Sequence, residues 1–224
     1  MNISVVTSDS LNKIWQDNLE SIGNPDITIF GFNGLGLVSY KKELSGETED
    51  FEDLARLSKQ LSSVVISGCD TDTYGIFRHS GVIADSGKIL GVTDMLYSTE
   101  NSEYAPGGNL RVYQTSKGRI GIVIGEDLFF SDVVNTLSIC DAEIIVCLFK
   151  EIDASITKTV IKALSFCNGV DIILVSKGEF CLAESSGKIK IASRSNIVKT
   201  NININKEYRL LSFKKRMAKN SFKE

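Results

Sequence analysis

Apolar runs without polar alternation recur along this chain, and segments with helical periodicity separate them. Residues 3–6 and 64–67 are such runs and 26–30 is a further expected strand, whereas the apolar positions within 11–22 and 51–61 follow helical spacing. An apolar run without alternation is typical of a strand covered on both faces, and helical spacing is typical of a helix with one buried side. The order of the two patterns predicts crossover units of parallel strands and helices, which belong to an α/β fold.

The rest of the chain adds hairpins to these crossover units. Neighbouring apolar runs are separated by short turn sequences, namely Asp85-Ser86-Gly87, Ser116-Lys117-Gly118 and Ser185-Ser186-Gly187. Further strands are expected at 75–84, 88–92, 110–114, 120–124, 143–149, 171–176 and 196–204, and further helices at 131–139 and 155–166. Residues 94–108 lack periodicity, so we expect a long loop there. These elements predict a layered sandwich in which helices cover sheets that pack face to face, as one domain over residues 1–212.

Composition excludes several classes of protein. The 224 residues are 42% hydrophobic and 24% charged, and the formal net charge is −3, which indicates a folded globular chain. The first residues show no basic segment followed by a long apolar one, and no window approaches the roughly 18 apolar residues that a membrane span needs. The five cysteines are odd in number and mostly embedded in apolar runs, as is typical of reduced cysteine. We therefore expect a cytoplasmic protein without a membrane partner.

Positive charge gathers at the C-terminus. Residues 206–224 contain seven Lys or Arg and two Glu. Because the rest of the chain is acidic, we expect residues 213–224 to form a solvated basic tail, and we expect no nucleic-acid partner.

Metal and nucleotide sites have little support in the sequence. His79 is the only histidine, which excludes a zinc site built from several histidines, and no Cys-x-x-Cys pair occurs. The glycines at 34–36 and 107–108 do not open a helix with phosphate-binding spacing, so no cofactor is expected. His79 stands between Arg78 and Ser80 in a predicted strand, where a surface or structural role is the expectation.

One long motif and several short ones resemble a known family. Residues 106–132 read PGGNLRVYQTSKGRIGIVIGEDLFFSD, which resembles the Pro-Gly turn, hairpin and nucleophile strand of the nitrilase, or carbon-nitrogen hydrolase, superfamily. Further segments resemble the family in order and spacing, namely 26–30, 82–91, 141–146, 181–189 and 196–203. The resemblance implies a four-layer α-β-β-α sandwich whose protomers join through helices into a dimer or a higher homo-oligomer.

The family's chemistry uses a cysteine nucleophile, a glutamate base and a lysine that stabilises the oxyanion. In their places this chain has Gly125 for the cysteine, Phe32 or Asn33 for the glutamate, and Thr93, Asp94 or Met95 for the lysine. Members of such a triad act as a unit, so the loss of the nucleophile alone removes most of the rate enhancement. Gly125 is expected to enlarge the old pocket, and Phe32 and Met95 to make it more apolar.

Other groups near these positions could replace the triad. Glu126 and Asp127 follow Gly125, and Glu103 precedes the Pro-Gly turn. Together with Phe32, Asn33, Met95 and Gly125 they form the candidate pocket. Cys140 and Cys147 are the nearest cysteines in sequence to Gly125, and both are expected to pack in the core.

Two functional hypotheses follow from the resemblance. The first is a pseudoenzyme without catalytic residues that acts as a small-ligand-binding, regulatory or assembly protein, with an active paralogue among its partners. The alternative is a divergent amide or nitrile hydrolase that uses relocated acidic residues, Glu126 or Glu103.

Overall fold

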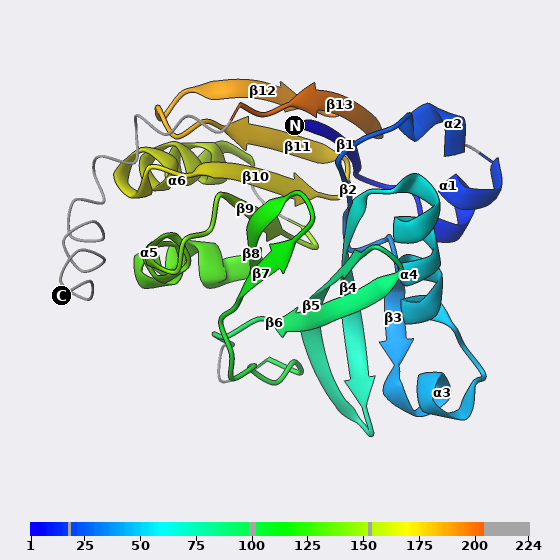
Figure 1. Cartoon of the computed structure of the whole chain (residues 1–224). Helices are drawn as coiled ribbons and strands as arrows, with labels where there is room; N and C mark the ends of the chain where they lie inside the picture. The colour runs from blue at the N-terminus through cyan, green and yellow to red at the C-terminus, as the bar shows by residue number, and fades with distance from the viewer. Residues whose placement is uncertain (18, 99–101, 152–153, 204–224) are drawn as a thin grey trace, which may run out of the picture.

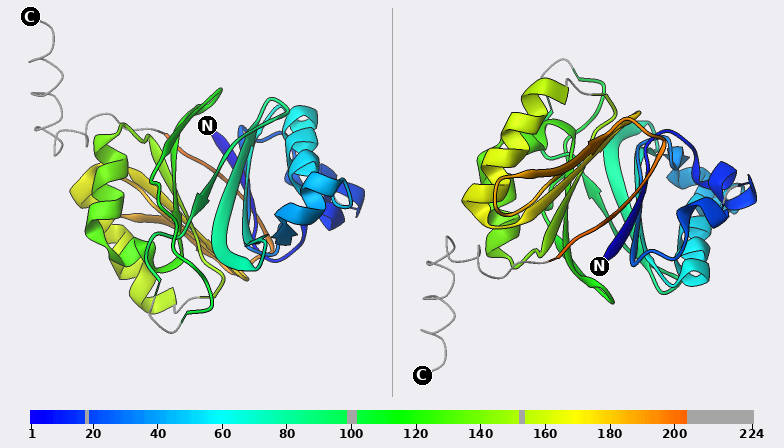
Figure 2. Two further views of the ribbon diagram at one scale, coloured as in Figure 1. Left: turned by 90° about the horizontal axis from the view of Figure 1, so that it is seen from below. Right: turned by 90° about the horizontal axis from the view of Figure 1, so that it is seen from above.

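The computed structural model describes residues 1–17, 19–98, 102–151 and 154–203, and it has four layers. Two β-sheets pack face to face, and helices cover the outer face of each sheet, as the two views of Figure 2 show. The predicted α/β sandwich is therefore confirmed. The predicted basic tail, 213–224, lies outside the described residues.

The first sheet combines parallel and antiparallel strands. Its order is β13-β1-β2-β4-β5-β6, and β3 pairs with the second half of β4 (Figure 1). Strands β1, β2, β3 and β4 run parallel in their pairs, whereas β5, β6 and β13 pair antiparallel with their neighbours. The strands are β1 (Asn2–Val6), β2 (Ile27–Phe30), β3 (Gly36–Ser39), β4 (Val64–Thr73), β5 (Ile76–Asp85), β6 (Lys88–Asp94) and β13 (Ile197–Asn201).

The second sheet has the order β12-β11-β10-β9-β8-β7, with β8, β9 and β10 parallel at its centre. Each of these three central strands is buried over most or all of its length, which explains their nearly continuous apolar sequences. The strands are β7 (Val112–Thr115), β8 (Gly118–Ile124), β9 (Ile144–Leu148), β10 (Asp171–Ser176), β11 (Glu179–Ala183) and β12 (Ile189–Ser193).

The helices fall into two groups, one on each sheet. The first sheet carries α1 (Leu11–Asp17), α2 (Leu19–Ile22), α3 (Tyr40–Ser45) and α4 (Asp50–Leu61), and the second carries α5 (Ser131–Ile139) and α6 (Ala154–Asn168). A short 3₁₀ helix, η1 (Gly125–Phe129), directly follows β8. Among the described residues, no helix is long and apolar enough to cross a membrane.

Three apolar clusters fill the spaces between the layers. The cluster between the sheets contains side chains from both, including Ile29, Ile66, Ile122, Val146 and Ile173. The other two lie between each sheet and its helices. Gly81 on β5 allows the sheets to approach each other closely, because a Cβ there would lie 2.8 Å from Cδ1 of Ile124.

The predicted elements differ from the observed ones in a few places. The predicted helix 131–139 and strand 171–176 have the observed bounds. The predicted helix 11–22 is described as α1 and α2, on either side of residue 18. Strand β4 extends to Thr73 rather than ending at residue 67, and β3 and α3 were not predicted, because polar residues and glycines interrupt the apolar pattern there.

Candidate functional site

Three of the positions singled out by sequence come together at one end of the sandwich. Phe32 follows β2, Met95 follows β6 and Gly125 follows β8. Strands β2 and β6 run in the same direction within their sheet, so their carboxyl ends reach the same edge. Phe32 and Met95 belong to the cluster between the sheets and are 6% and 5% exposed. We call Phe32, Met95 and Gly125 the apolar corner.

Gly125 and Met95 are in direct contact range. The backbone of Gly125 has φ +54°, a left-handed conformation that favours glycine. A Cβ at this position would lie 3.1 Å from Sδ of Met95. The thioether of Met95 therefore occupies the space beside Gly125, and the expected enlargement of the pocket at this point is not found.

The alternative residues at the triad positions lie elsewhere. Asn33 is exposed, and its Nδ2 donates a hydrogen bond to the carbonyl oxygen of Ser8 at 3.2 Å. The buried Thr93 shares a 2.8 Å hydrogen bond with the hydroxyl of Tyr113. Only Phe32 and Met95 among these alternatives lie in the same buried cluster beside Gly125.

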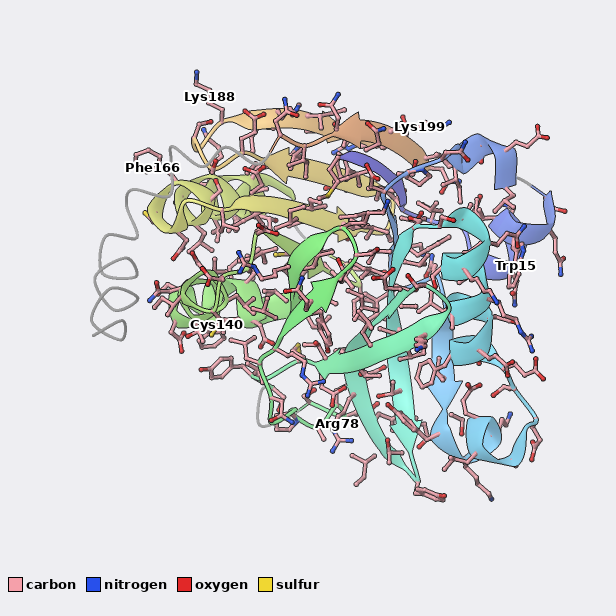
Figure 3. The ribbon with its side chains drawn as sticks, viewed as in Figure 1. Trp15, Arg78, Cys140, Phe166, Lys188 and Lys199 are labelled. Atoms are coloured by element: carbon pink, nitrogen blue, oxygen red, sulfur yellow. The ribbon has the colours of Figure 1, made fainter. Side chains whose placement is uncertain are left out.

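Asp94 also points away from Gly125. Its Oδ1 accepts a 2.6 Å hydrogen bond from the hydroxyl of Ser80, and its Oδ2 lies 3.8 Å from Nε of Arg78. Figure 3 labels Arg78 in the lower part of the molecule, where the β4–β5 hairpin projects. Asp94 is thus part of the surface of this hairpin rather than of the apolar corner.

A cavity of about 350 Å³ opens beside the apolar corner. Among the described residues, its lining consists of His79, Met95, Tyr97, Ser98, Ser102, Glu126 and Phe130. Two of the predicted pocket residues, Met95 and Glu126, therefore contribute to it. Glu103 is exposed on the loop after Ser102 and is not among the lining residues described.

Asp127 lies behind the cavity and holds one of its walls. This buried carboxylate accepts hydrogen bonds from the backbone N–H groups of Leu96 at 2.7 Å and Tyr97 at 2.9 Å. Burial raises the pKa of Asp127 from 3.8 to about 6, against the effect of the two N–H donors, and the charge of Glu126 adds to the rise. Asp127 thereby fixes the segment after β6 onto η1, which places Tyr97 against Phe130 with ring centroids 3.9 Å apart.

A polar network that the sequence analysis did not predict borders the same cavity. Nδ1 of His79 lies 2.6 Å from Oδ1 of Asp70, and Nζ of Lys150 lies 2.6 Å from Oδ2 of the same carboxylate. The hydroxyl of Tyr104 lies 3.4 Å from both Oδ2 of Asp70 and Nζ of Lys150. We call His79, Asp70, Tyr104 and Lys150 the His79 cluster.

The aromatic residues around His79 fix the orientation of its ring. Tyr104 stacks on the imidazole with centroids 3.7 Å apart and planes 19° apart, and Phe32 approaches it edge to face at 5.7 Å. Burial opposes ionisation of Asp70, but the hydrogen bonds from His79 and Lys150 outweigh it and lower the pKa of Asp70. His79 is therefore a half-buried residue whose ring is held by one hydrogen bond and two aromatic neighbours, in agreement with the expected structural role.

The register of the β4–β5 hairpin creates the His79 cluster. Asp70 and His79 are directly opposed partners, and the two strands join through Tyr74 and Gly75, both with positive φ. Such a two-residue turn sets the register of a hairpin. The turn Tyr74-Gly75 is therefore the feature of the sequence from which the pairing of Asp70 with His79 could have been predicted.

The cysteines lie away from the cavity lining described. Cys69, Cys147 and Cys181 are buried in the outer clusters, between a sheet and its helices. The expected burial of Cys147 is confirmed, but the expected burial of Cys140 is wrong. Cys140 is exposed because it is the residue that ends α5, and Cys167 is exposed in the last turn of α6.

Comparison at the level of sequence finds no relatives. No family model matches the chain, and no curated protein matches it.

Solved structures, in contrast, match nearly the whole chain. An amidase of the nitrilase superfamily from Nesterenkonia AN1 has a TM-score of 0.73 at 12% identity, with 98% of this chain and 96% of that chain covered. Nit3 from Saccharomyces cerevisiae, a member of branch 10 of the superfamily, has a TM-score of 0.74 at 12% identity, with 96% and 93% covered. A carbon-nitrogen hydrolase from Helicobacter pylori G27 has a TM-score of 0.71 at 14% identity, with 100% of this chain and 95% of that chain covered. The chain therefore has the fold of the nitrilase superfamily, as the motifs predicted.

Proposed function

We propose that this protein uses the carbon-nitrogen hydrolase fold to bind a small ligand and does not perform the cysteine-dependent hydrolysis of that family. The observation that carries the proposal is the apolar corner. In the amidase from Nesterenkonia, acrylamide adds to an active-site cysteine. Here the equivalent position by motif is Gly125, with the sulfur of Met95 against it.

The thiols of the described residues support this proposal. A catalytic thiol needs a low pKa and access to the substrate. Burial raises the pKa of Cys69 and of Cys147 well above the usual range, and it raises that of Cys181 to about 11. These three thiols therefore carry little thiolate at neutral pH, and none of them lines the cavity as described.

The cavity itself supports the binding half of the proposal. A volume of about 350 Å³ is within the range of small-molecule sites. The lining combines apolar surface from Met95 and Phe130 with a few polar groups, which is the usual composition of such sites.

Ammonia release from a panel of amides and nitriles tests the proposal. We expect no release above that of the heat-denatured protein. Steady turnover that is lost after alkylation of the cysteines would sink the proposal, because it would mean that one of the five thiols acts as the nucleophile.

The alternative hydrolase with relocated acidic residues is favoured by one observation, the position of Glu126 in the cavity lining. In that case ammonia release survives cysteine alkylation and disappears in Glu126→Gln. The variant Glu103→Gln is the matched control, because Glu103 is exposed and outside the lining described.

We also propose that two copies associate through the helical layer formed by α5 and α6. This layer exposes large apolar side chains, with Ile139 56%, Ile156 59% and Phe166 48% exposed. Figure 3 labels Cys140 and Phe166 on this side of the molecule, away from the first sheet. Analytical ultracentrifugation is expected to show a dimer that Phe166→Glu dissociates, whereas a monomeric wild-type protein would contradict the proposal.

A further inference from the structure

The cavity has an uneven distribution of charge. Of the described lining residues, Glu126 carries the formal charge, and neither Lys nor Arg contributes. The lining otherwise offers the aromatic rings of Tyr97 and Phe130, the thioether of Met95, hydroxyl groups and the imidazole of His79. A cavity with this lining favours a ligand that brings positive charge.

The groups around Glu126 reinforce its negative potential. The carboxylate of Glu126 is exposed and makes no hydrogen bond or ion pair with the described residues, and the carboxyl of Asp127 is the next one along the chain. The hydroxyl of Tyr97 lies 3.3 Å from Oδ2 of Asp132, and the charge of Asp132 raises the pKa of Tyr97. An ammonium group beside Glu126 would therefore meet a favourable field from the carboxyl groups of Glu126 and Asp127, and Asp132 adds negative charge at the hydroxyl of Tyr97.

Tyr97 and Phe130 supply a face suited to the apolar part of such a cation. Their rings are stacked with planes 16° apart, and they remain 40% and 41% exposed. Exposed faces of tyrosine and phenylalanine attract organic cations through the ring quadrupole. The same surface excludes water from one side of the ligand.

A further lining residue, His79, offers a hydrogen-bond acceptor. When the imidazole of His79 carries one proton, the Asp70 carboxylate 2.6 Å from Nδ1 places that proton on Nδ1, which leaves Nε2 to accept a hydrogen bond. Lys150 lies 2.6 Å from the other oxygen of Asp70 and balances its charge. Tyr104 and Phe32 hold the ring in place, and no hydrogen bond engages Nε2 within the part of the chain that the structure describes.

We propose that this cavity binds a small organic cation, a primary ammonium or amidinium carried on a short apolar group. Its N–H donors bond to the carboxylate of Glu126 and to Nε2 of His79, and its apolar part lies on Tyr97 and Phe130. This inference rests on the proposed binding function and specifies its ligand class.

A matched series of probes tests the charge preference. Benzylamine, benzyl alcohol and benzoate have the same ring and carry a positive, no and a negative charge at pH 7. His79 is the only histidine, so its imidazole proton signals are unique in the NMR spectrum. We expect benzylamine to shift these signals saturably, and the other two probes to bind at least about tenfold more weakly, because charge-assisted hydrogen bonds are the stronger ones.

Substitutions of Glu126 and His79 test whether these two residues bind the ammonium group. Glu126→Gln keeps the shape of the side chain and is expected to weaken benzylamine binding about tenfold while leaving the weak binding of benzyl alcohol unchanged. Glu20→Gln removes the same charge from an exposed position on α2, outside the cavity lining described, and is expected to leave binding unchanged. For His79→Gln, calorimetric titration replaces NMR and is expected to show a loss of several-fold, with the far-ultraviolet circular dichroism unchanged.

The outcomes separate this inference from the function on which it rests. If benzyl alcohol or benzoate binds as tightly as benzylamine, the inference about the cation is overturned, whereas the proposed ligand-binding function stands. A failure of all three probes to shift the His79 signals also overturns the inference, whereas ammonia release from the amide panel overturns the proposed function. Unchanged benzylamine affinity in Glu126→Gln shows that the carboxylate is not the recognition group and overturns the inference as well.

Discussion

The apolar corner and the His79 cluster border the same cavity, and they differ in the polarity of their side chains. The apolar corner has buried residues without charge at the positions that the sequence analysis aligned with the family's reactive groups. The His79 cluster instead joins four polar side chains through hydrogen bonds over a half-buried carboxylate. At this end of the sandwich the hydrogen-bonded and charged side chains therefore lie in the His79 cluster and not in the apolar corner.

The largest expected effect comes from putting a charge back into the apolar corner. Phe32→Glu removes a buried ring and places a carboxylate among apolar side chains, so we expect a loss of about 4 kcal/mol in the free energy of unfolding. Phe32→Leu keeps the corner apolar and is expected to cost about 1 kcal/mol. Urea unfolding followed by the fluorescence of Trp15, the only tryptophan, measures both. A loss in Phe32→Glu no larger than that in Phe32→Leu would mean that the corner tolerates charge.

The second effect concerns Asp127, which supports the cavity wall from behind the apolar corner. Its folded-state pKa of about 6 lies above the ordinary value of 3.8, so folding favours the protonated form. Its contribution to stability is fully present below pH 3.8 and is lost as pH rises through about 6. The stability of the wild type relative to Asp127→Asn is expected to fall by about 2–3 kcal/mol between pH 4 and pH 7.

Urea titrations of both proteins at several pH values measure this difference. A relative stability that rises with pH would mean that the N–H groups of Leu96 and Tyr97 outweigh burial, and that the pKa of Asp127 is lowered instead.

The polar side is tested by removing the carboxylate at its centre. Asp70→Ala leaves the imidazole of His79 without its partner and Lys150 without its counter-charge. Because Lys150 is 53% exposed and remains hydrated, we expect a moderate loss of about 2 kcal/mol in the free energy of unfolding.

A surface ion pair provides the control for Asp70→Ala. Glu52→Ala breaks the exposed pair between Glu52 and Arg56 on α4, and little change in unfolding is expected. Equal effects of the two substitutions would mean that the His79 cluster is an ordinary surface network.

The sequence predicts the regular elements and the apolar corner better than the His79 cluster, and the reason is physical. Apolar periodicity is local, so the helix 131–139 and the strand 171–176 were predicted with their observed bounds. The family motif likewise pointed to Gly125 and limited the alternatives for the other two positions. The His79 cluster depends on the register of the β4–β5 hairpin, where apolar periodicity gives no signal, and on Lys150, which lies 80 residues from Asp70 in the chain. The contact between Met95 and Gly125 also depends on packing between two sheets, which no spacing in the sequence encodes.

The smallest loss in the free energy of unfolding is expected for a substitution at Gly125. A second glycine, Gly36, separates the cost of the left-handed backbone from the cost of the contact with Met95. Gly125→Ala places a Cβ at φ +54° and 3.1 Å from Sδ of Met95, whereas Gly36→Ala places one at φ +68° with no atom within 4 Å. Both substitutions are expected to cost about 1 kcal/mol for the left-handed backbone. Only Gly125→Ala should lose a few tenths more, since the flexible thioether of Met95 must move. The excess should vanish when Met95→Ala is added, as a double-mutant cycle in urea measures. An excess that persists without the thioether would mean that Met95 does not fill the space at Gly125, which would remove the main support for an apolar corner closed to chemistry.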